Sequence, residues 1–279
     1  MDWPLTELCA AIASKIPGFS AEVLPSIDST NSELMRRSKN GFLEPLLLIA
    51  EEQTAGKGRL GRVWFANPGD CLTFSIGLNL SIQDWSGFSL AVGLGILQAL
   101  DPHQHYGVGL KWPNDLWLGL GDPHTARKLG GILIESAVST APSGAVPHSR
   151  YCVIGVGINL VAPQGVDLKR AAAGWCDVDP KSRPGSVLLS AVSGIIKGVM
   201  RFQERGFSSF KNEYSAYDIL FNQQVSMSNG VVGRACGVNS RGELLIQTSA
   251  GVVPVISDEV SLVELGGFES DLKLRPDSE

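Results

Sequence analysis

Hydrophobic residues along the first 220 positions fall into two patterns, which predict buried strands and amphipathic helices. Continuous apolar runs lie within 44–52 and 150–160, and runs of this length are typical of strands buried on both faces. Residues 71–80 alternate between apolar and polar positions as a strand does, whereas 85–101 has helical spacing and length despite its glycines. The region 183–218 is also helical in pattern. These segments predict a sheet that is covered by helices.

A helix is also predicted over 29–38, directly after a predicted strand over 21–27. Asp28, Ser29 and Thr30 are alternative N-caps for it, because short polar side chains accept hydrogen bonds from the first free N–H groups of a helix. A short amphipathic helix is predicted before it, over 6–16.

Residues 108–138 have the pattern of successive antiparallel strands joined by two turns. Segments 113–115 and 121–123 contain the proline, asparagine, aspartate and glycine that turns require. Together with the preceding segments they predict an α+β fold, with helices on a mixed and largely antiparallel sheet.

The pattern changes after residue 220, where short strands alternate with turns rich in serine, asparagine and glycine. Turns at this spacing predict a small β-barrel of SH3 type. We therefore expect a catalytic-type domain over 1–220, the small barrel over 221–268, and a disordered tail over 269–279.

Composition excludes several classes of protein. With 28 acidic and 23 basic residues the net charge is −5, so the totals contain no signature of DNA binding. Five scattered cysteines without a CxxC pair favour reduced thiols and a cytoplasmic location. The start of the chain resembles no signal peptide, and the apolar stretch 88–100 is too short to span a bilayer, so no membrane partner is expected.

One short segment is difficult to explain by packing. Residues 51–65, the glycine–cation segment, contain Lys57, Arg59 and Arg62 interleaved with glycines. The spacing does not match a Walker phosphate loop. A solvated surface loop is one interpretation, and a flexible cationic loop that folds over a phosphate or carboxylate is the other.

The run KWPND places Lys111 and Asp115 on either side of a proline turn between apolar flanks. An exposed ion pair without function is one interpretation. The other is functional: the lysine would hold a phosphate, the aspartate would orient a metal or an incoming amine, and Asn114 would offer an oxygen to Mg²⁺.

Two glycine-containing strand segments complete the pattern. In RKLGGIL, Lys128 precedes Gly130 and Gly131, and glycine inside a strand marks a bulge or a close ligand. The run GVGIN at 155–159 lacks the third glycine of a dinucleotide fingerprint, but a flat ligand could lie against it within reach of Asn159. The four histidines have no third clustered ligand, so a histidine metal site is not expected.

Taken in order, the runs IDSTN (27–31), EEQTAGKGRLGRVW (51–64), KWPNDL with RKLGGIL (111–133) and GVGIN (155–159) resemble the biotin–protein ligases over about residues 20–265. The resemblance implies a class II synthetase-like catalytic domain followed by the small barrel. It also implies that biotin and MgATP form biotinyl-5′-adenylate. The biotinyl group then passes to a lysine of a biotin carboxyl carrier domain, usually in acetyl-CoA carboxylase.

The resemblance also implies roles for residues that match the motifs. The residues implied to act in catalysis are Lys111, Asp115, Lys128 and Arg59. Those implied to bind biotin are Ser29, Thr30, Asn31, Gln53, Lys57, Gly58, Arg59, Lys128, Gly131, Gly155 and Gly157. Those implied to bind ATP or the adenylate are Arg62, Trp64, Lys111, Asn159 and Trp175, of which Trp175 rests only on its offset after GVGIN.

This sequence departs from the family in two respects. Lys57 stands where the pattern often has arginine, which keeps the charge but loses the planar fork and would loosen retention of the adenylate. Only about 20 residues precede the first motif, too few for the winged helix-turn-helix of the regulatory members, so we expect a ligase that does not bind DNA.

Two rival functions remain open at this point. A lipoate or octanoyl ligase would use a similar fold and a lysine-centred site. A non-enzymatic adaptor would use the barrel to bind a partner and would consume no nucleotide. The exposed edges of an antiparallel sheet would permit a homodimer, although no feature of the sequence requires one.

Overall fold

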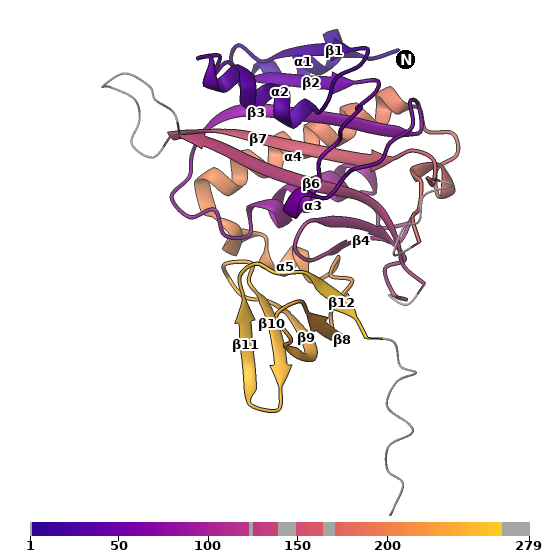
Figure 1. The fold of residues 1–279 in the computed structure, drawn as a ribbon, viewed down its shortest axis with the longest axis vertical. Coiled ribbons are helices and arrows are strands. Elements are labelled where there is room, and N and C mark those ends of the chain that lie inside the picture. The colour runs from indigo at the N-terminus through magenta and orange to yellow at the C-terminus, as the bar shows by residue number, and fades with distance from the viewer. Residues whose placement is uncertain (1, 123–124, 139–148, 164–170, 264–279) are drawn as a thin grey trace, which may run out of the picture.

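The larger part of the protein is a seven-stranded mixed sheet flanked by helices (Figure 1). The computed structural model describes residues 2–122, 125–138, 149–163 and 171–263. The strands follow the spatial order β1-β2-β3-β7-β6-β5-β4. Their bounds are β1 Ser20–Leu24, β2 Leu46–Ala50, β3 Cys71–Ser81, β4 Val108–Lys111, β5 Asp115–Leu118, β6 Arg127–Val138 and β7 Ser149–Asn159.

Only one pairing in this sheet is parallel, the one between β1 and β2, and the other five are antiparallel. All five residues of β2 are buried, and β7 lies at the centre of the sheet. The predicted α+β class and the two continuous apolar strands are therefore confirmed.

The helices cover both faces of the sheet. On β6, Ile132 approaches Gly93 of α3, whereas Asn31 of α2 lies over Gly155, the β7 partner of the neighbouring Leu133. Because successive strand residues point to opposite faces, α2 and α3 lie on opposite sides. The helices are α1 Leu5–Ala13, α2 Thr30–Lys39, α3 Phe88–Leu100, α4 Pro184–Arg205 and α5 Lys211–Tyr214, with short 3₁₀ turns at Arg59–Gly61, Trp175–Asp177 and Phe207–Ser209.

Helices α3 and α4 pack unusually closely. A Cβ atom on Gly95 would lie 2.4 Å from the carbonyl oxygen of Gly194, so both positions require glycine for this approach. Helix α4 is long and apolar enough to cross a membrane, yet 61% of its most apolar window is buried inside the protein. Its apolar character is therefore accounted for by the core.

The C-terminal part of the described chain is a five-stranded antiparallel sheet, drawn in yellow and orange in Figure 1. Its strands follow the order β11-β10-β9-β8-β12. The SH3 type and the boundary at 220 stay predictions, and the predicted tail lies outside the described residues. The strand bounds are β8 Gln224–Met227, β9 Val232–Val238, β10 Leu244–Thr248, β11 Gly251–Val255 and β12 Val260–Leu262.

The two sheets meet at the KWPND turn, residues 111–115, between β4 and β5. The Lys111 ammonium donates to the carbonyl oxygen of Val260 at 2.7 Å, and the Trp112 indole donates to that of Gly242 at 3.0 Å. Both side chains are buried. The smaller sheet therefore holds one end of this turn in place.

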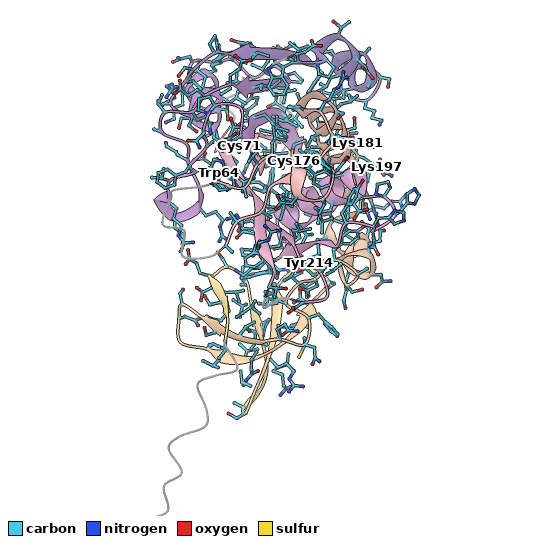
Figure 2. The ribbon with its side chains drawn as sticks, turned by 90° about the vertical axis from the view of Figure 1, so that its right-hand side faces the viewer. Trp64, Cys71, Cys176, Lys181, Lys197 and Tyr214 are labelled. Carbon is cyan, nitrogen blue, oxygen red and sulfur yellow. The ribbon has the colours of Figure 1, made fainter. Side chains whose placement is uncertain are left out.

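A buried carboxylate lies where the chain passes from α5 toward the smaller sheet. Burial raises the pKa of Asp218 to about 6, even though its Oδ1 accepts from the Leu220 amide at 2.9 Å. Figure 2 places the adjoining Tyr214, also buried, at the junction of the two sheets. The pKa of Asp218 in the folded protein exceeds its ordinary value of 3.8, so the ionised carboxylate lowers the free energy of unfolding above about pH 6. This destabilisation decreases as the pH falls from 6 toward 4, because the folded protein then binds the proton.

We therefore expect Asp218→Asn to stabilise the protein at pH 8, raising its free energy of unfolding by a few kcal/mol. The gain should shrink between pH 6 and 4, where the aspartic acid itself becomes neutral. Urea unfolding at pH 8 and pH 4.5 measures both values. As a control, Asp101→Asn should destabilise, because both carboxylate oxygens of Asp101 accept backbone N–H groups, at 2.8 and 2.9 Å. A loss of stability in Asp218→Asn at pH 8 would contradict this prediction.

Candidate active site

Two cross-strand rows that contain three glycines form the floor of the candidate site, on the face covered by α2. In the first row Thr73, Gly157, Gly131 and Asp115 lie directly opposite one another on β3, β7, β6 and β5. The second row, two residues farther along, contains Ser75, Gly155 and Leu133. Residues opposite one another in a sheet point to the same face. Because glycine has no side chain, the three glycines leave a shallow depression on this face of the sheet.

The indole of Trp64 lies on the first row. A Cβ atom on Gly157 would be 2.4 Å from the Trp64 ring, and one on Gly131 would be 3.3 Å away. Figure 2 shows Trp64 close to Cys71, the first residue of β3. A ligand lying against Gly157 must therefore displace this indole. A half-open pocket of about 160 Å³ adjoins Trp64 and is also lined by Gln53 and Gly56.

Lys128 and Asp115 form an ion pair at the edge of this depression, with 2.8 Å between Nζ and Oδ1. Both atoms lie 3.6 Å from the position that a Cβ on Gly131 would occupy. A shift in the pairing of β5 with β6 leaves Leu129 without a partner, so Lys128 points to the same face as Gly131. The bulge thus places an ammonium group over the glycine floor, 5.6 Å from the Trp64 ring centroid.

The glycine–cation segment folds back across the site. Its two arms are joined by hydrogen bonds from the Gly58 amide to the Arg62 carbonyl, at 2.7 Å, and from the Trp64 amide to the Gly56 carbonyl, at 2.9 Å. Leu60, at the tip, is in the left-handed region with φ of 55°. Because the folded segment removes water from its cations, other polar groups must replace that water.

Arg59 and Arg62 find such groups on other parts of the chain. The Arg59 guanidinium donates to Asn114 Oδ1 at 3.1 Å and to Ser257 Oγ at 3.3 Å. Burial lowers its pKa from the ordinary value, and the nearby carboxylate of Asp115 opposes that shift. Arg62 pairs with Glu259. The segment therefore joins the KWPND turn to the smaller sheet, while Lys57 remains exposed.

The start of α2 supplies a buried polar cluster on the same face. Ser29 is the N-cap, since its hydroxyl accepts from the Ser32 amide. The Thr30 amide donates to Gln53 Oε1 at 2.7 Å, and the Thr30 hydroxyl oxygen lies 3.1 Å from the same atom. The Asn31 side chain fills the space above Gly155, where a Cβ would lie 2.0 Å from its Oδ1. Gly155 therefore contacts Asn31 rather than open space.

Three of the expected ligand-binding residues are engaged elsewhere. The Lys111 ammonium contacts Val260 and lies 5.4 Å from the Trp117 ring centroid. The Asn159 amide donates to the carbonyls of Ala173 and Lys128, at 3.1 and 3.4 Å, so it supports the strand that carries Lys128.

Trp175 does not offer a face to adenine in this arrangement. Its side chain is 2% exposed, its indole donates to Ser182 at 3.1 Å, and Tyr106 packs edge-on against it with 5.5 Å between ring centroids. The adenine role expected from its offset after GVGIN stays a prediction, and it would require the ring to leave this packing.

Asn114 does not fit the expected role as a magnesium ligand. Its Oδ1 already accepts from the cationic Arg59, and its Nδ2 donates to the Ile132 carbonyl at 2.8 Å. A guanidinium beside the oxygen repels a second cation. Within the described ranges, no group of three histidine, cysteine, aspartate or glutamate side chains could hold a metal ion. The side chain instead fixes the glycine–cation segment to the KWPND turn.

Comparison with known proteins identifies relatives of the chain. Residues 23–159 match the model of the biotin/lipoate A/B protein ligase family. The chain is 36% identical over 251 residues to the biotin–[acetyl-CoA-carboxylase] ligase of Mycobacterium tuberculosis, a match that covers 86% of this chain and 87% of that protein. It is 30% identical over 262 residues to the bifunctional ligase/repressor BirA of Escherichia coli, covering 90% and 76% of the two chains.

A solved structure shows the same architecture with ligands bound. The biotin protein ligase of Aquifex aeolicus in complex with biotin and ATP superposes with a TM-score of 0.70 at 26% identity. The match covers 87% of this chain and 98% of the other.

Proposed function

Because the chain belongs to the biotin/lipoate A/B protein ligase family, we propose that it activates biotin with ATP and transfers the biotinyl group to a lysine of a carrier protein. The observation that carries this proposal is the Lys128–Asp115 pair above the glycine floor formed by Gly131 and Gly157. The relatives named as biotin ligases and the neighbour with biotin and ATP support biotin over lipoate as the substrate.

In the first step the biotin carboxylate attacks the α-phosphate of ATP, and pyrophosphate leaves. Two anions repel one another at this point, so cations already fixed in place lower the barrier. Lys128 is positioned to neutralise the carboxylate and the α-phosphate. Magnesium would enter bound to ATP, as part of the substrate.

The polar cluster at the start of α2 is suited to the other end of biotin. A cyclic urea has a carbonyl acceptor between two N–H donors, and it requires both kinds of partner. Ser29, Thr30, Asn31 and Gln53 provide donors and acceptors within one buried cluster. Gly155 contributes by admitting the Asn31 side chain, and Gly157 would contact the ligand once Trp64 moves.

The glycine–cation segment then closes over the adenylate. Lys57, Gly58 and Arg59 would cover biotin, and Arg62 would exchange Glu259 for a phosphate. A closed segment keeps water from the mixed anhydride. Lys111 acts at a distance from this chemistry by holding the KWPND turn against the smaller sheet.

In the second step the amine of the acceptor lysine attacks the acyl carbon, and AMP leaves. The amine must lose a proton, and Asp115 is held in place by Lys128 to accept it. The proposed acceptor is a lysine of a biotin carboxyl carrier domain.

A cytoplasmic location and a homodimer remain predictions. Sedimentation at several protein concentrations tests whether the protein forms a homodimer.

The proposal is tested by biotin-dependent exchange of labelled pyrophosphate into ATP. The pure protein should catalyse this exchange with biotin and not with lipoate. Exchange with lipoate alone would favour a lipoate ligase, and absence of exchange with either acid would favour the adaptor.

Arg59→Ala should accelerate release of biotinyl-adenylate from the enzyme by about ten- to a hundredfold, because a hydrogen bond from a charged group contributes about 1.5–3 kcal/mol. The guanidinium links the segment to Asn114 and Ser257, so its loss lets the segment open. Rapid gel filtration followed by quantification of free adenylate measures the release rate. Arg183→Ala, which alters an arginine preceding α4, serves as the control. An unchanged release rate in Arg59→Ala would rule out the role assigned to the segment.

A further inference from the structure

A continuous line of hydrogen bonds runs from β6 to the mouth of the pocket, and it contains two residues that have no assigned role. Asn31 Nδ2 donates to Glu135 Oε2 at 2.9 Å, and Asn31 Oδ1 is 2.6 Å from Ser75 Oγ. Ser75 Oγ is in turn 2.7 Å from Thr30 Oγ1. Thr30 borders Gln53, whose side chain lines the pocket.

The register of the sheet explains why these groups meet. Ser75 is opposite Gly155, which is opposite Leu133, and Glu135 lies two residues beyond Leu133 on the same face of β6. Gly155 has no side chain, so the Asn31 amide can lie on the sheet between Ser75 and Glu135. Ser75, Thr30 and Asn31 are 0–3% exposed, so water cannot replace a missing partner within this line.

The carboxylate at one end sets the direction of every proton in the line. An ionised carboxylate only accepts, so the Asn31 amide must turn its NH₂ group toward Glu135 and its oxygen toward Ser75. That oxygen also only accepts, so the Ser75 hydroxyl donates to it. The Ser75 oxygen is then left to accept from the Thr30 hydroxyl at 2.7 Å. This contact is shorter than the 3.1 Å between that hydroxyl and Gln53 Oε1, which the Thr30 amide already holds.

This order of protons determines which groups Thr30 and Gln53 offer to a ligand in the pocket. With its proton directed toward Ser75, the Thr30 hydroxyl presents lone pairs. The Thr30 amide holds Gln53 Oε1 at 2.7 Å, which leaves the Gln53 NH₂ group as a donor. An acceptor next to a donor is the complement of the N–H and C=O groups of a cyclic urea.

We propose that Glu135 is a positioning residue for biotin, which acts through Asn31 and Ser75 to make Thr30 an acceptor for a ureido N–H. This inference rests on the proposed function. Glu135 contacts Asn31 rather than the ligand, so its effect should fall on recognition of the ureido ring and not on the chemistry at the carboxylate.

The test compares Glu135→Leu with Glu135→Gln in biotin-dependent pyrophosphate exchange. Leucine cannot accept, and the KM for biotin should rise about ten- to a hundredfold while kcat and the KM for ATP change less than about threefold. Glutamine retains an acceptor oxygen and should restore the KM for biotin to within about threefold of the wild type. Should Glu135→Leu fail to fold, Ser75→Ala interrupts the same line and should give the same rise.

A second probe separates a positioning role from a general loss of packing. Biotin methylated at its ureido nitrogens cannot donate to Thr30, so Glu135→Leu should bind this analogue about as well as the wild type does, as measured by calorimetry. An equal loss for biotin and the analogue, or an unchanged KM for biotin, would overturn the inference. If the wild-type protein itself shows no biotin-dependent exchange, the proposed function fails instead.

Discussion

Lys128→Ala should lower biotin-dependent pyrophosphate exchange by roughly 100- to 1,000-fold, the cost of removing one preorganised group that stabilises developing charge. The ammonium lies over the glycine floor, 3.6 Å from the position of a Cβ on Gly131. Its loss leaves the repulsion between carboxylate and α-phosphate unscreened, and it also leaves Asp115 without its partner. Initial-rate exchange assays at saturating biotin and ATP measure the effect.

The control for this variant is the adjacent residue. Arg127 forms a similar ion pair with Asp177, at 2.8 Å, but before the bulge at Leu129 and away from the floor. Arg127→Ala should retain exchange within about threefold of the wild type, as expected for a half-exposed pair. Equal losses in Arg127→Ala and Lys128→Ala would mean that the strand and not the ammonium is responsible.

Asp115→Asn should separate the two steps of the reaction. Transfer of biotin from preformed adenylate to the carrier lysine should fall by about 100-fold or more, since general base catalysis contributes typically 10²–10⁴-fold. Pyrophosphate exchange should fall far less, because asparagine keeps the shape of the side chain and Lys128 remains. Single-turnover transfer to a biotin carboxyl carrier domain, measured beside exchange, gives both numbers.

Asp177→Asn provides the matched control, since it alters an aspartate that is also paired with a neighbouring cation on β6. It should leave both steps within about threefold of the wild type. Were exchange and transfer to fall in parallel in Asp115→Asn, the aspartate would act only by holding Lys128.

Much of the fold could be predicted from the sequence because its strands are strongly patterned. The apolar runs at β2 and β7 are buried along their length, and this leaves few alternatives to a central position. The turn residues of the KWPND segment likewise fix the β4–β5 hairpin. The segment after residue 220 forms five short antiparallel strands, as its regularly spaced turns predict.

The site was harder to predict, because it depends on register and on one bulge. Counting residues along a regular strand would put Lys128 and Gly131 on opposite faces, and the unpaired Leu129 reverses this. Glu135 and Ser75 have no motif of their own, and only the pairing of β3, β7 and β6 brings them to Asn31. A hydrogen-bonded cluster that depends on the alignment of three strands cannot be recognised in the sequence of any single strand.

The contacts of Trp175 and Lys111 also could not be predicted from the sequence. Trp175 follows the GVGIN segment at a suggestive distance, but packing against Tyr106 covers its ring. Lys111 has the charge that a phosphate requires, yet its ammonium is used to join the two sheets. Residue type and spacing identify which groups are available, and the tertiary contacts determine which of them face a ligand.

A crystal structure of the protein with biotin and ATP tests the central claim most directly. The account predicts that Lys128 Nζ lies about 3 Å from an oxygen of the adenylate, with the ring system of biotin beside Thr30 and residues 51–65 closed over it. An adenylate bound elsewhere, with residues 51–65 extended into solvent and Lys128 still paired only with Asp115, would contradict it.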